Sequence, residues 1–224
     1  RLGKREDVEL TVLPEDLRKD KAARKECINS SDAVFLCLPD AAAIESVGMV
    51  ENDHVKIFDA STAHRTAPGW AYGFPELSPD FRRAIAEGKR IANPGCHASG
   101  FIALVYPLVA AGIVGADYPF VAHSVTGYSG GGKKMIAEYR APERDAELDS
   151  PRQYALTLSH KHLPEMTGVC GLSREPVFQP IVADYYAGMC VFVPLFSDLM
   201  KTKLAPDGLR DFYRDFYRDA KLIS

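Results

Sequence analysis

Short apolar runs alternate with helix-like segments through residues 1–95, and this alternation restricts the possible folds more than any other feature of the sequence. The runs predict strands at residues 8–13, 33–39 and 55–61, and the intervening segments predict helices at residues 16–27 and 41–50. Near-continuous apolar strands that alternate with helices are typical of a parallel sheet covered on both faces. We therefore expect residues 1–95 to form a doubly wound α/β domain.

Polar residues follow two of these predicted strands, at the edge where parallel sheets bind ligands. Leu38 and Pro39 end one apolar run, and Ser61 and Arg65 follow the next run in the stretch DASTAHR. The planar guanidinium of Arg65 can bind a carboxylate or a phosphate, although an exposed salt-bridge role fits it equally well. Doubly wound folds begin with a strand and a glycine-rich turn for a pyrophosphate. We expect that unit to be absent, because nothing before Val8 matches it.

The pattern changes from residue 96 onward. The sequence there predicts a helix at 97–111 that stops at Gly112, a strand at 119–127, a loop or frayed helix at 138–152, a strand at 189–196 and an amphipathic helix at 206–220. The first of these strands ends in the glycine-rich stretch GYSGGGKK. This stretch lacks the G-x-x-x-x-G-K-[ST] spacing of a phosphate loop, so a nucleoside triphosphate site is not indicated.

Composition narrows the classes of partner. The net charge of −3 comes from interspersed signs, which give no basic field for nucleic acid and no polybasic patch for a membrane. The apolar stretches are too short or too interrupted to span a bilayer. The five cysteines are scattered and not spaced like metal ligands: Cys27, Cys37, Cys96, Cys170 and Cys190. Four of them fit small buried hydrophobic residues in a reducing cytosol, so we expect a cytoplasmic protein without a metal.

Cys96 has a different context, because the stretch NPGCHASG places it at the start of the predicted helix. Pro94 suits a helix start, and we expect Gly95 to let the backbone turn sharply. Ser99 and Gly100 are small enough for a ligand to approach. A thiol at a helix N-terminus lies near unpaired N–H groups, which favour the thiolate and can stabilise an oxyanion. A buried structural cysteine is the alternative, but this context favours a nucleophile.

A cysteine nucleophile needs a group that moves protons, and the stretch LSHKHLPEM offers two candidates. His160 and His162 are two residues apart, so they face the same side if the segment is extended. Glu165 follows closely, and its carboxylate can fix a histidine tautomer. Metal binding by the two histidines is the alternative, but no third candidate ligand lies at the sequence spacing typical of a metal site.

Together these motifs resemble the N-acetyl-gamma-glutamyl-phosphate reductases in their shorter bacterial form. The matching stretches are FLCLPD, FDASTAHRTAPGWAYGFPEL, IANPGCHASG, VTGYSGGGKKMI and HKHLPEM, in the order of the family. The resemblance implies an incomplete dinucleotide-binding domain over residues 1–95. It implies an α+β catalytic and dimerisation domain of the semialdehyde-dehydrogenase type over residues 96–224, without the family's C-terminal end. A homo-oligomer is also implied.

The resemblance further implies an activity in arginine biosynthesis. NADPH would reduce N-acetyl-L-glutamyl 5-phosphate to N-acetyl-L-glutamate 5-semialdehyde through a thioester on Cys96, with release of inorganic phosphate. His162 matches the acid/base histidine of the family. The implied substrate-binding residues are His160, Arg65, Ser129, Gly130 and Glu165, and the implied cofactor-binding residues are Leu38, Pro39, Ser61, Ser99 and Gly100.

Other functions remain open from the residues alone. A related aspartate-semialdehyde-type dehydrogenase shares the chemistry. A cysteine hydrolase or acyltransferase would use Cys96 and His162 without hydride transfer, and the missing glycine loop favours it. An inactive interaction module would keep only the fold. The roles of His160 and His162 are also exchangeable at this point.

Overall fold

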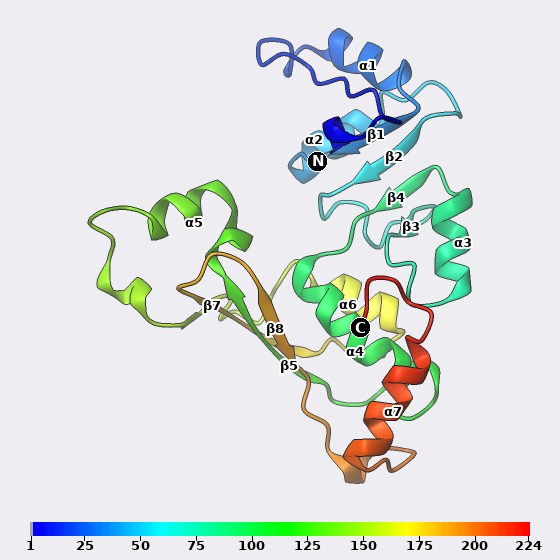
Figure 1. Cartoon of the computed structure of the whole chain (residues 1–224), viewed down its shortest axis with the longest axis vertical. Coiled ribbons are helices and arrows are strands. Elements are labelled where there is room, and N and C mark those ends of the chain that lie inside the picture. Colours follow the sequence, from blue (N-terminus) through cyan, green and yellow to red (C-terminus); the bar gives the residue numbers. More distant parts are fainter. Residues whose placement is uncertain (1) are drawn as a thin grey trace. The chain divides into compact units, whose positions relative to one another are not determined.

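The computed structural model describes residues 2–224 and contains two compact units, each with its own sheet (Figure 1). The first unit extends to Gly73 and includes Arg83–Asn93. The second unit comprises Phe74–Arg82 and Pro94–Ser224. Among residues 2–224, no helix is both long and apolar enough to cross a membrane.

The first unit contains a four-stranded parallel sheet in the order β1-β2-β4-β3. Its strands are β1 (Ala33–Leu36), β2 (Lys56–Asp59), β3 (Ala71–Tyr72) and β4 (Arg90–Ala92). The helices of this part of the chain are η1 (Leu2–Lys4), α1 (Lys21–Asn29), α2 (Asp40–Val47) and α3 (Pro79–Glu87), whose first residues belong to the second unit. The parallel α/β arrangement predicted from the apolar runs is confirmed.

The core of the first unit is formed by apolar residues of β1, β2, α1 and α2, together with Val55 just before β2. Its buried members are Ile28, Leu36, Ala43, Val55 and Ile57. Because all four strands run in the same direction, their carboxyl ends lie at one edge of the sheet. Register pairs Leu36 with Asp59 and Asp59 with Ala92 at that edge, so the segments after β1, β2 and β4 begin side by side.

The strand predicted at residues 8–13 is wrong. These residues form no strand and pair with none within residues 2–224, and Leu10 and Val12 are exposed. An apolar run becomes a strand only when another strand satisfies its backbone groups, and here no described strand does. The prediction that Cys37 is buried is also wrong. Cys37 follows β1, which is an edge strand of the sheet.

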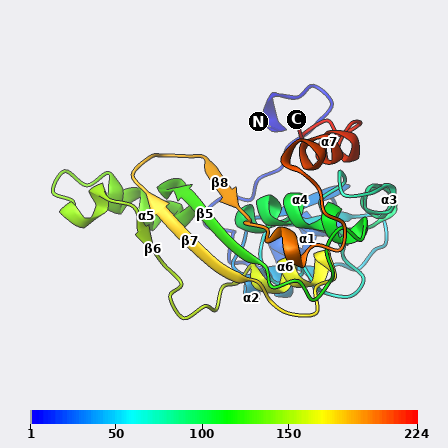
Figure 2. The ribbon, with the colours of Figure 1, turned by 90° about the horizontal axis from the view of Figure 1, so that it is seen from below.

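The second unit contains a mixed sheet in the order β6-β7-β5-β8. Its strands are β5 (Val121–Gly127), β6 (Arg152–Gln153), β7 (Val177–Ala183) and β8 (Met189–Phe192). Its helices are α4 (Cys96–Ala110), η2 (Tyr128–Gly131), α5 (Gly132–Tyr139), η3 (Ala146–Asp149), α6 (Leu163–Cys170), η4 (Ser197–Leu199) and α7 (Pro206–Phe216). Strands β5 and β7 run parallel, side by side, with α5 beyond one end of β5 (Figure 2).

Helix α4 is the central helix of the second unit and packs against α6 and β8. It starts at Cys96 as predicted, and Gly112 adopts a φ of 67° just after its C-terminus, which confirms the predicted stop. Its large buried apolar residues include Phe101, Ile102, Val105 and Leu108. Gly100 lies against β8, where a Cβ atom would stand 2.5 Å from Val191. Glycine at position 100 therefore allows α4 to pack closely against β8, where a larger residue would contact the Val191 side chain.

The C-terminal helix α7 is fastened to α4 by two tyrosines. Tyr217 donates its hydroxyl to the Ala103 carbonyl at 2.7 Å, and Tyr213 donates to the Leu104 carbonyl. Exposed ion pairs join Arg214 to Asp211 within α7 and Arg218, just after the helix, to Asp215.

Two predictions for the second unit need correction. The region 138–152 is not only loop or frayed helix, because it holds η3 and the start of β6. Cys190 is exposed rather than buried, since β8 is the edge strand next to β5. Cys27 is half-buried, so Cys170 alone among the four cysteines matches the predicted burial.

Candidate active site

Cys96 is the first residue of α4, and its side chain is exposed. The residue before it, Gly95, is the N-cap, with an ordinary φ of −72° and ψ of 146°. The prediction that a glycine is needed there for a sharp turn is therefore wrong. Gly95 is instead buried, and its N–H donates to Oε2 of Glu165 at 3.0 Å. This bond holds the entrance of α4 against α6.

The two candidate histidines lie together, but not on an extended segment as predicted. They occupy a turn that leads into α6, where Pro164 and Glu165 in the first turn are ordinary signals of a helix start. The N–H of His162 donates to Nδ1 of His160 at 3.2 Å, and the two ring centroids are 4.7 Å apart. A local turn thus brings the rings together.

His162 and Glu165 form a buried pair at the start of α6. Their exposed fractions are 3% and 1%, and Nε2 of His162 lies 4.0 Å from Oε1 of Glu165. This separation suits an ion pair rather than a hydrogen bond. The Glu165 carboxylate thus contacts the Gly95 N–H through one oxygen and faces His162 with the other.

His160 has a defined tautomer. Because its Nδ1 accepts the N–H of His162, a neutral ring carries its proton on Nε2. Burial lowers the pKa of His160 below its usual value, and the charge of Lys161 acts in the same direction. His160 is therefore a neutral donor near neutral pH.

His97 was not predicted as a site residue, although it lies inside the NPGCHASG motif. Its side chain is buried, with Nδ1 2.7 Å from Oγ of Ser124 and Nε2 2.7 Å from the hydroxyl of Tyr154. Its ring centroid lies 5.8 Å from that of His160 and 5.6 Å from that of His162. His97 thus contacts both histidines, while Gly95, on the other side of Cys96, contacts Glu165 in the first turn of α6.

Tyr154 is the second missed residue. Burial raises the pKa of its hydroxyl to about 12, and the charge of the Cys96 thiolate adds to this. Its hydroxyl lies 2.7 Å from Nε2 of His97, the residue that follows Cys96. No sequence signal pointed to Tyr154, because it lies in an irregular stretch just after β6.

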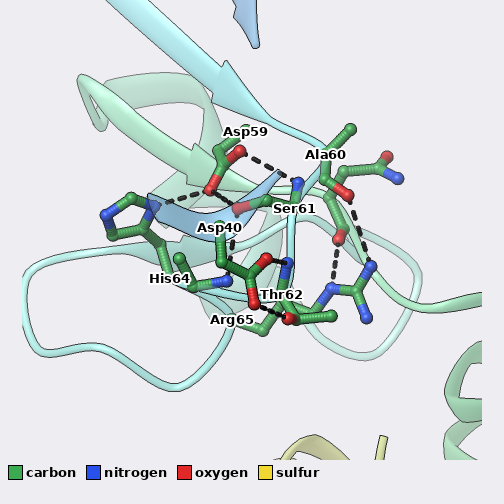
Figure 3. Close-up of polar contacts among 9 residues, drawn as sticks. Asp40, Asp59, Ala60, Ser61, Thr62, His64 and Arg65 are labelled. Atoms are coloured by element: carbon green, nitrogen blue, oxygen red, sulfur yellow. Dashed lines mark hydrogen bonds and ion pairs between the residues drawn. The ribbon is translucent and has the colours of Figure 1, made fainter. Parts of the chain in front are cut away.

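In the first unit, a second polar cluster follows β2 (Figure 3). The fully buried carboxylate of Asp59 accepts the N–H of Ser61 at 2.9 Å and its hydroxyl at 2.7 Å. Nδ1 of His64 lies 2.6 Å from the same carboxylate, and the His64 ring stacks on Trp70 with centroids 4.1 Å apart. These contacts hold the loop after β2 in one conformation.

Two further residues tie this loop to its neighbours (Figure 3). Asp40, at the start of α2, accepts the N–H of Thr62 at 2.9 Å and also its hydroxyl. Nε of Arg65 donates to the Asn93 carbonyl at 3.0 Å, and Nη2 donates to the Ala60 carbonyl at 3.4 Å. Arg65 thereby joins the ends of β2 and β4, and its predicted role in substrate binding stays a prediction.

The remaining predicted residues occupy loop and helix-start positions. Leu38 and Pro39 lie between β1 and α2, with Pro39 as the N-cap of α2. The hydroxyl of Ser99 donates to the Gly95 carbonyl at 2.9 Å. Ser129 donates its N–H to the Tyr186 carbonyl at 2.9 Å, which places it and Gly130 in a surface turn after β5. These contacts do not join Ser129 to the cluster around Cys96.

The buried His97 predicts a dependence of stability on pH. Burial lowers the pKa of His97 from 6.5 to about 4, and the charges of His160 and Lys161 act in the same direction. Between these values the unfolded chain binds a proton that the folded protein does not, so stability falls as the pH is lowered. The free energy of unfolding should decrease by about 2–3 kcal/mol between about pH 7 and about pH 4.5 on account of this residue.

Urea unfolding followed by circular dichroism measures this effect. The variant His97→Gln cannot titrate, so its stability should fall less over the same pH range, by the amount that His97 contributes. Parallel stability curves for the parent and the variant would contradict the assignment.

Comparison with family models covers nearly the whole chain. Residues 6–85 match the semialdehyde dehydrogenase NAD binding domain. Residues 96–224 match the semialdehyde dehydrogenase dimerisation domain.

Curated relatives are similar over most of the chain. A protein of Chelativorans sp. named N-acetyl-gamma-glutamyl-phosphate reductase is 51% identical to this chain. The match covers 87% of this chain and 62% of the relative's length. N-acetyl-gamma-glutamyl-phosphate reductase 2 of Pseudomonas putida is 44% identical, and the match covers 94% of this chain and 67% of that protein. The reductase of Burkholderia lata is 42% identical, and the match covers 99% of this chain and 70% of that protein.

Solved structures share the fold at low sequence identity. The aspartate semialdehyde dehydrogenase from Francisella tularensis aligns with a TM-score of 0.62 at 13% identity, over 86% of this chain and 65% of that one. The aspartate semialdehyde dehydrogenase with NADP from Candida albicans aligns with a TM-score of 0.52 at 15% identity, over 82% and 55% of the two chains. With both domain models matched and 42% identity over 99% of its length, this chain belongs to the N-acetyl-gamma-glutamyl-phosphate reductase family.

Proposed function

We propose that the protein converts N-acetyl-L-glutamyl 5-phosphate to N-acetyl-L-glutamate 5-semialdehyde in arginine biosynthesis, with Cys96 as the nucleophile. One observation carries the proposal. Cys96 is an exposed thiol at the first position of α4, and both of its neighbours in the chain contact the segment of His160, His162 and Glu165. We take the substrate from the names of the relatives, which are N-acetyl-gamma-glutamyl-phosphate reductases.

The first step is attack of the Cys96 thiolate on the acyl carbon of the substrate. A carbon–sulfur bond forms, the bond from that carbon to the phosphate oxygen breaks, and inorganic phosphate leaves with the electron pair. The N–H groups of the first turn of α4 have no partner within the helix, so they suit the oxyanion of the tetrahedral intermediate.

His162 is the proposed acid/base group. It is buried beside His97, the residue that follows Cys96, and its Nε2 lies 4.0 Å from Oε1 of Glu165. A protonated His162 gives its proton to the substrate oxygen that gains charge, and it takes a proton back when thiolate leaves. His160 is neutral with a proton on Nε2, so its proposed role is to donate a hydrogen bond to the substrate. Glu165 is proposed to orient His162 and thereby to shape the substrate site.

The carboxyl edge of the parallel sheet fits a dinucleotide cofactor. All four strands of the sheet end at one edge, and the α2 N-terminus and the ordered loop after β2 lie there. When bound, NADPH supplies the hydride that reduces the acyl group. The proposed contacts are Leu38, Pro39, Ser61, Ser99 and Gly100. The Ser61 hydroxyl already donates to Asp59, so Ser61 can offer the cofactor an acceptor only.

Arg65, Ser129 and Gly130 are proposed as further substrate contacts. Two donors of Arg65 are used by backbone carbonyls, which fixes the guanidinium plane before any anion binds. We also propose a homo-oligomer, because residues 96–224 match a dimerisation domain. The five cysteines are free thiols, which is consistent with a proposed place in the reducing cytoplasm.

An assay of the full-length protein tests the proposal. In the reverse direction, reduction of NADP should require both inorganic phosphate and N-acetylglutamate semialdehyde. Aspartate semialdehyde should be used at least about a hundredfold less efficiently, because a site built for one polar chain leaves its groups unpaired with another. Equal use of the two aldehydes would contradict the proposed substrate, and phosphate-independent release of the acid would indicate a hydrolase.

A further inference from the structure

We propose that His64 is a cofactor-binding residue whose Nε2 accepts a hydrogen bond from a hydroxyl or amide group of the dinucleotide, with Asp59 holding the ring in the required tautomer. The inference deepens the proposed function and rests on it only in taking a nicotinamide dinucleotide as the cofactor. It adds two residues to the proposed cofactor site, and neither of them was predicted as a site residue.

Asp59 fixes the tautomer of His64. Asp59 is the last residue of β2, and its fully buried carboxylate accepts both the N–H and the hydroxyl of Ser61. Nδ1 of His64 lies 2.6 Å from Oδ2 of the same carboxylate. Because a carboxylate only accepts hydrogen bonds, Nδ1 carries a proton and Nε2 of the neutral ring presents a lone pair. His64 thus offers one acceptor in a defined direction.

Trp70 fixes the plane of the His64 ring. The two ring centroids are 4.1 Å apart and the ring planes differ by 13°, so the rings are stacked. The carboxylate of Asp59 holds one edge of the imidazole and the indole covers one face, which leaves a single orientation for the opposite edge. Figure 3 shows that the second ring nitrogen of His64 points away from Asp59.

Nε2 of His64 is available to a group outside the loop. It makes no hydrogen bond to any residue that the structure describes, and it reaches solvent, since the side chain keeps 10% of its surface exposed. The neighbouring hydroxyl of Ser61 is used inside the loop, because it donates to Asp59 and accepts the Ala63 N–H at 3.2 Å. The fixed ring therefore presents its acceptor outward.

The place of the loop in the sheet indicates the ligand. The loop follows β2, a central strand, at the edge where open parallel sheets bind ligands. Residues 6–85, which include the loop, match an NAD binding domain. A dinucleotide carries ribose hydroxyls and a carboxamide, and both groups can donate to an imidazole lone pair. Phosphate oxygens are acceptors, so Nε2 suits the neutral donors of the cofactor rather than its phosphates.

Support of the loop is the alternative role for His64. A purely structural histidine would act through the bond of Nδ1 to Asp59 and through the stack on Trp70, without any use of Nε2. A cofactor-binding histidine acts through Nε2. Stability and affinity therefore depend on different nitrogens, and variants that keep one nitrogen position at a time separate the two roles.

The test compares four variants of the full-length protein. In His64→Asn the shorter amide reaches the place of Nδ1, so the bond to Asp59 is kept and the acceptor at Nε2 is lost. In His64→Gln the longer amide reaches the place of Nε2, so an acceptor is kept there and the bond to Asp59 is lost. Trp70→Phe keeps a ring beside His64 and changes neither nitrogen. His54→Asn is the matched control, because His54 is an exposed histidine of the same unit.

Titration with NADPH, followed by the fluorescence of the cofactor, measures the Kd of each variant without any turnover. Thermal unfolding without NADPH measures the stability of the same samples. A second titration uses 2′,5′-ADP, which has the adenine half of the cofactor and no nicotinamide. An effect on both ligands places the donor in the adenine half, and an effect on NADPH alone places it in the nicotinamide half. Both results support the proposal.

We expect His64→Asn to raise the Kd for NADPH by about fivefold to tenfold, because one hydrogen bond to the cofactor is lost. His64→Gln should bind NADPH within about twofold of the parent but unfold at a lower temperature than His64→Asn, because the buried carboxylate of Asp59 loses a partner. Trp70→Phe should also bind within about twofold of the parent, and His54→Asn should match the parent in both measurements.

Two results would overturn the proposal: an unchanged Kd in His64→Asn, or a larger loss of affinity in His64→Gln than in His64→Asn. The second result would show that His64 acts only by supporting the loop. Should His64→Gln not fold, His64→Asn still decides the matter, because it keeps the bond to Asp59 and should bind weakly.

Failure of this proposal is distinguishable from failure of the proposed function. A parent protein that does not bind NADPH contradicts the cofactor of the proposed function, and this proposal with it. A parent that binds NADPH, with an unchanged Kd in His64→Asn, contradicts this proposal alone. The substrate of the proposed function is tested separately in the reductase assay.

Discussion

Replacement of Cys96 by serine is expected to lower the turnover of the full-length protein by at least about a thousandfold. A serine hydroxyl is almost entirely protonated near neutral pH and attacks an acyl phosphate far more slowly than a thiolate. At the first position of α4, serine would therefore present a neutral hydroxyl in place of the nucleophilic sulfur. Phosphate-dependent reduction of NADP with N-acetylglutamate semialdehyde measures the effect.

Cys190→Ser is the matched control, since Cys190 is also an exposed thiol but lies on the edge strand β8. Its turnover should equal that of the parent. Incubation of the parent with N-acetylglutamyl phosphate, without NADPH, should add the mass of the acyl group to the peptide that contains Cys96. Turnover of Cys96→Ser within about tenfold of the parent would remove the proposed nucleophile.

The position of Cys96 could be predicted because its signals are local. Pro94, the glycine before the cysteine and the apolar run behind it specify a helix start within a few residues, and α4 begins there. The alternation of strands and helices likewise predicted the parallel sheet of the first unit. The same pattern wrongly predicted a strand at residues 8–13. A strand forms only where its backbone pairs with another strand, and a short apolar run does not determine that pairing.

The surroundings of Cys96 could not be predicted, because they depend on contacts between distant residues. Glu165 is 70 positions from Gly95, Tyr154 is 57 positions from His97, and Ser124 is 27 positions from His97. Each of these contacts follows from the packing of α4 against α6 and the sheet, which no local pattern describes. A histidine directly beside a candidate nucleophile was the one signal available for His97.

The two histidines lie together as predicted, but the premise of that prediction was wrong. An extended segment was expected to place His160 and His162 on one side, whereas a turn stabilised by the His162 N–H and His160 Nδ1 brings the rings together. The difference matters for the chemistry. The turn uses Nδ1 of His160 as an acceptor, so only His162 keeps a ring that faces a carboxylate. This difference supports the separate roles proposed for the two residues, which the sequence left exchangeable.

His162→Asn is expected to lower kcat by about two to four orders of magnitude, the usual contribution of a positioned acid/base group. Asparagine cannot release a proton near neutral pH, so the oxyanion and the leaving thiolate would have to exchange protons with water. His162→Gln places an amide near the position of Nε2 and restores a hydrogen-bond donor without an exchangeable acid. It should therefore be as slow as His162→Asn. Steady-state kinetics with N-acetylglutamyl phosphate and NADPH measure both variants.

His160→Asn is the matched comparison, because the asparagine oxygen can still accept the His162 N–H while the donor at Nε2 is lost. Its effect should fall mainly on KM, with kcat within about tenfold of the parent. The pH profile separates the roles further, since the limb of kcat that reports the acid/base group should disappear in both His162 variants and persist in His160→Asn. A larger fall of kcat in His160→Asn, with KM unchanged, would exchange the two assignments. Rescue of kcat by His162→Gln would show that His162 donates a hydrogen bond and transfers no proton.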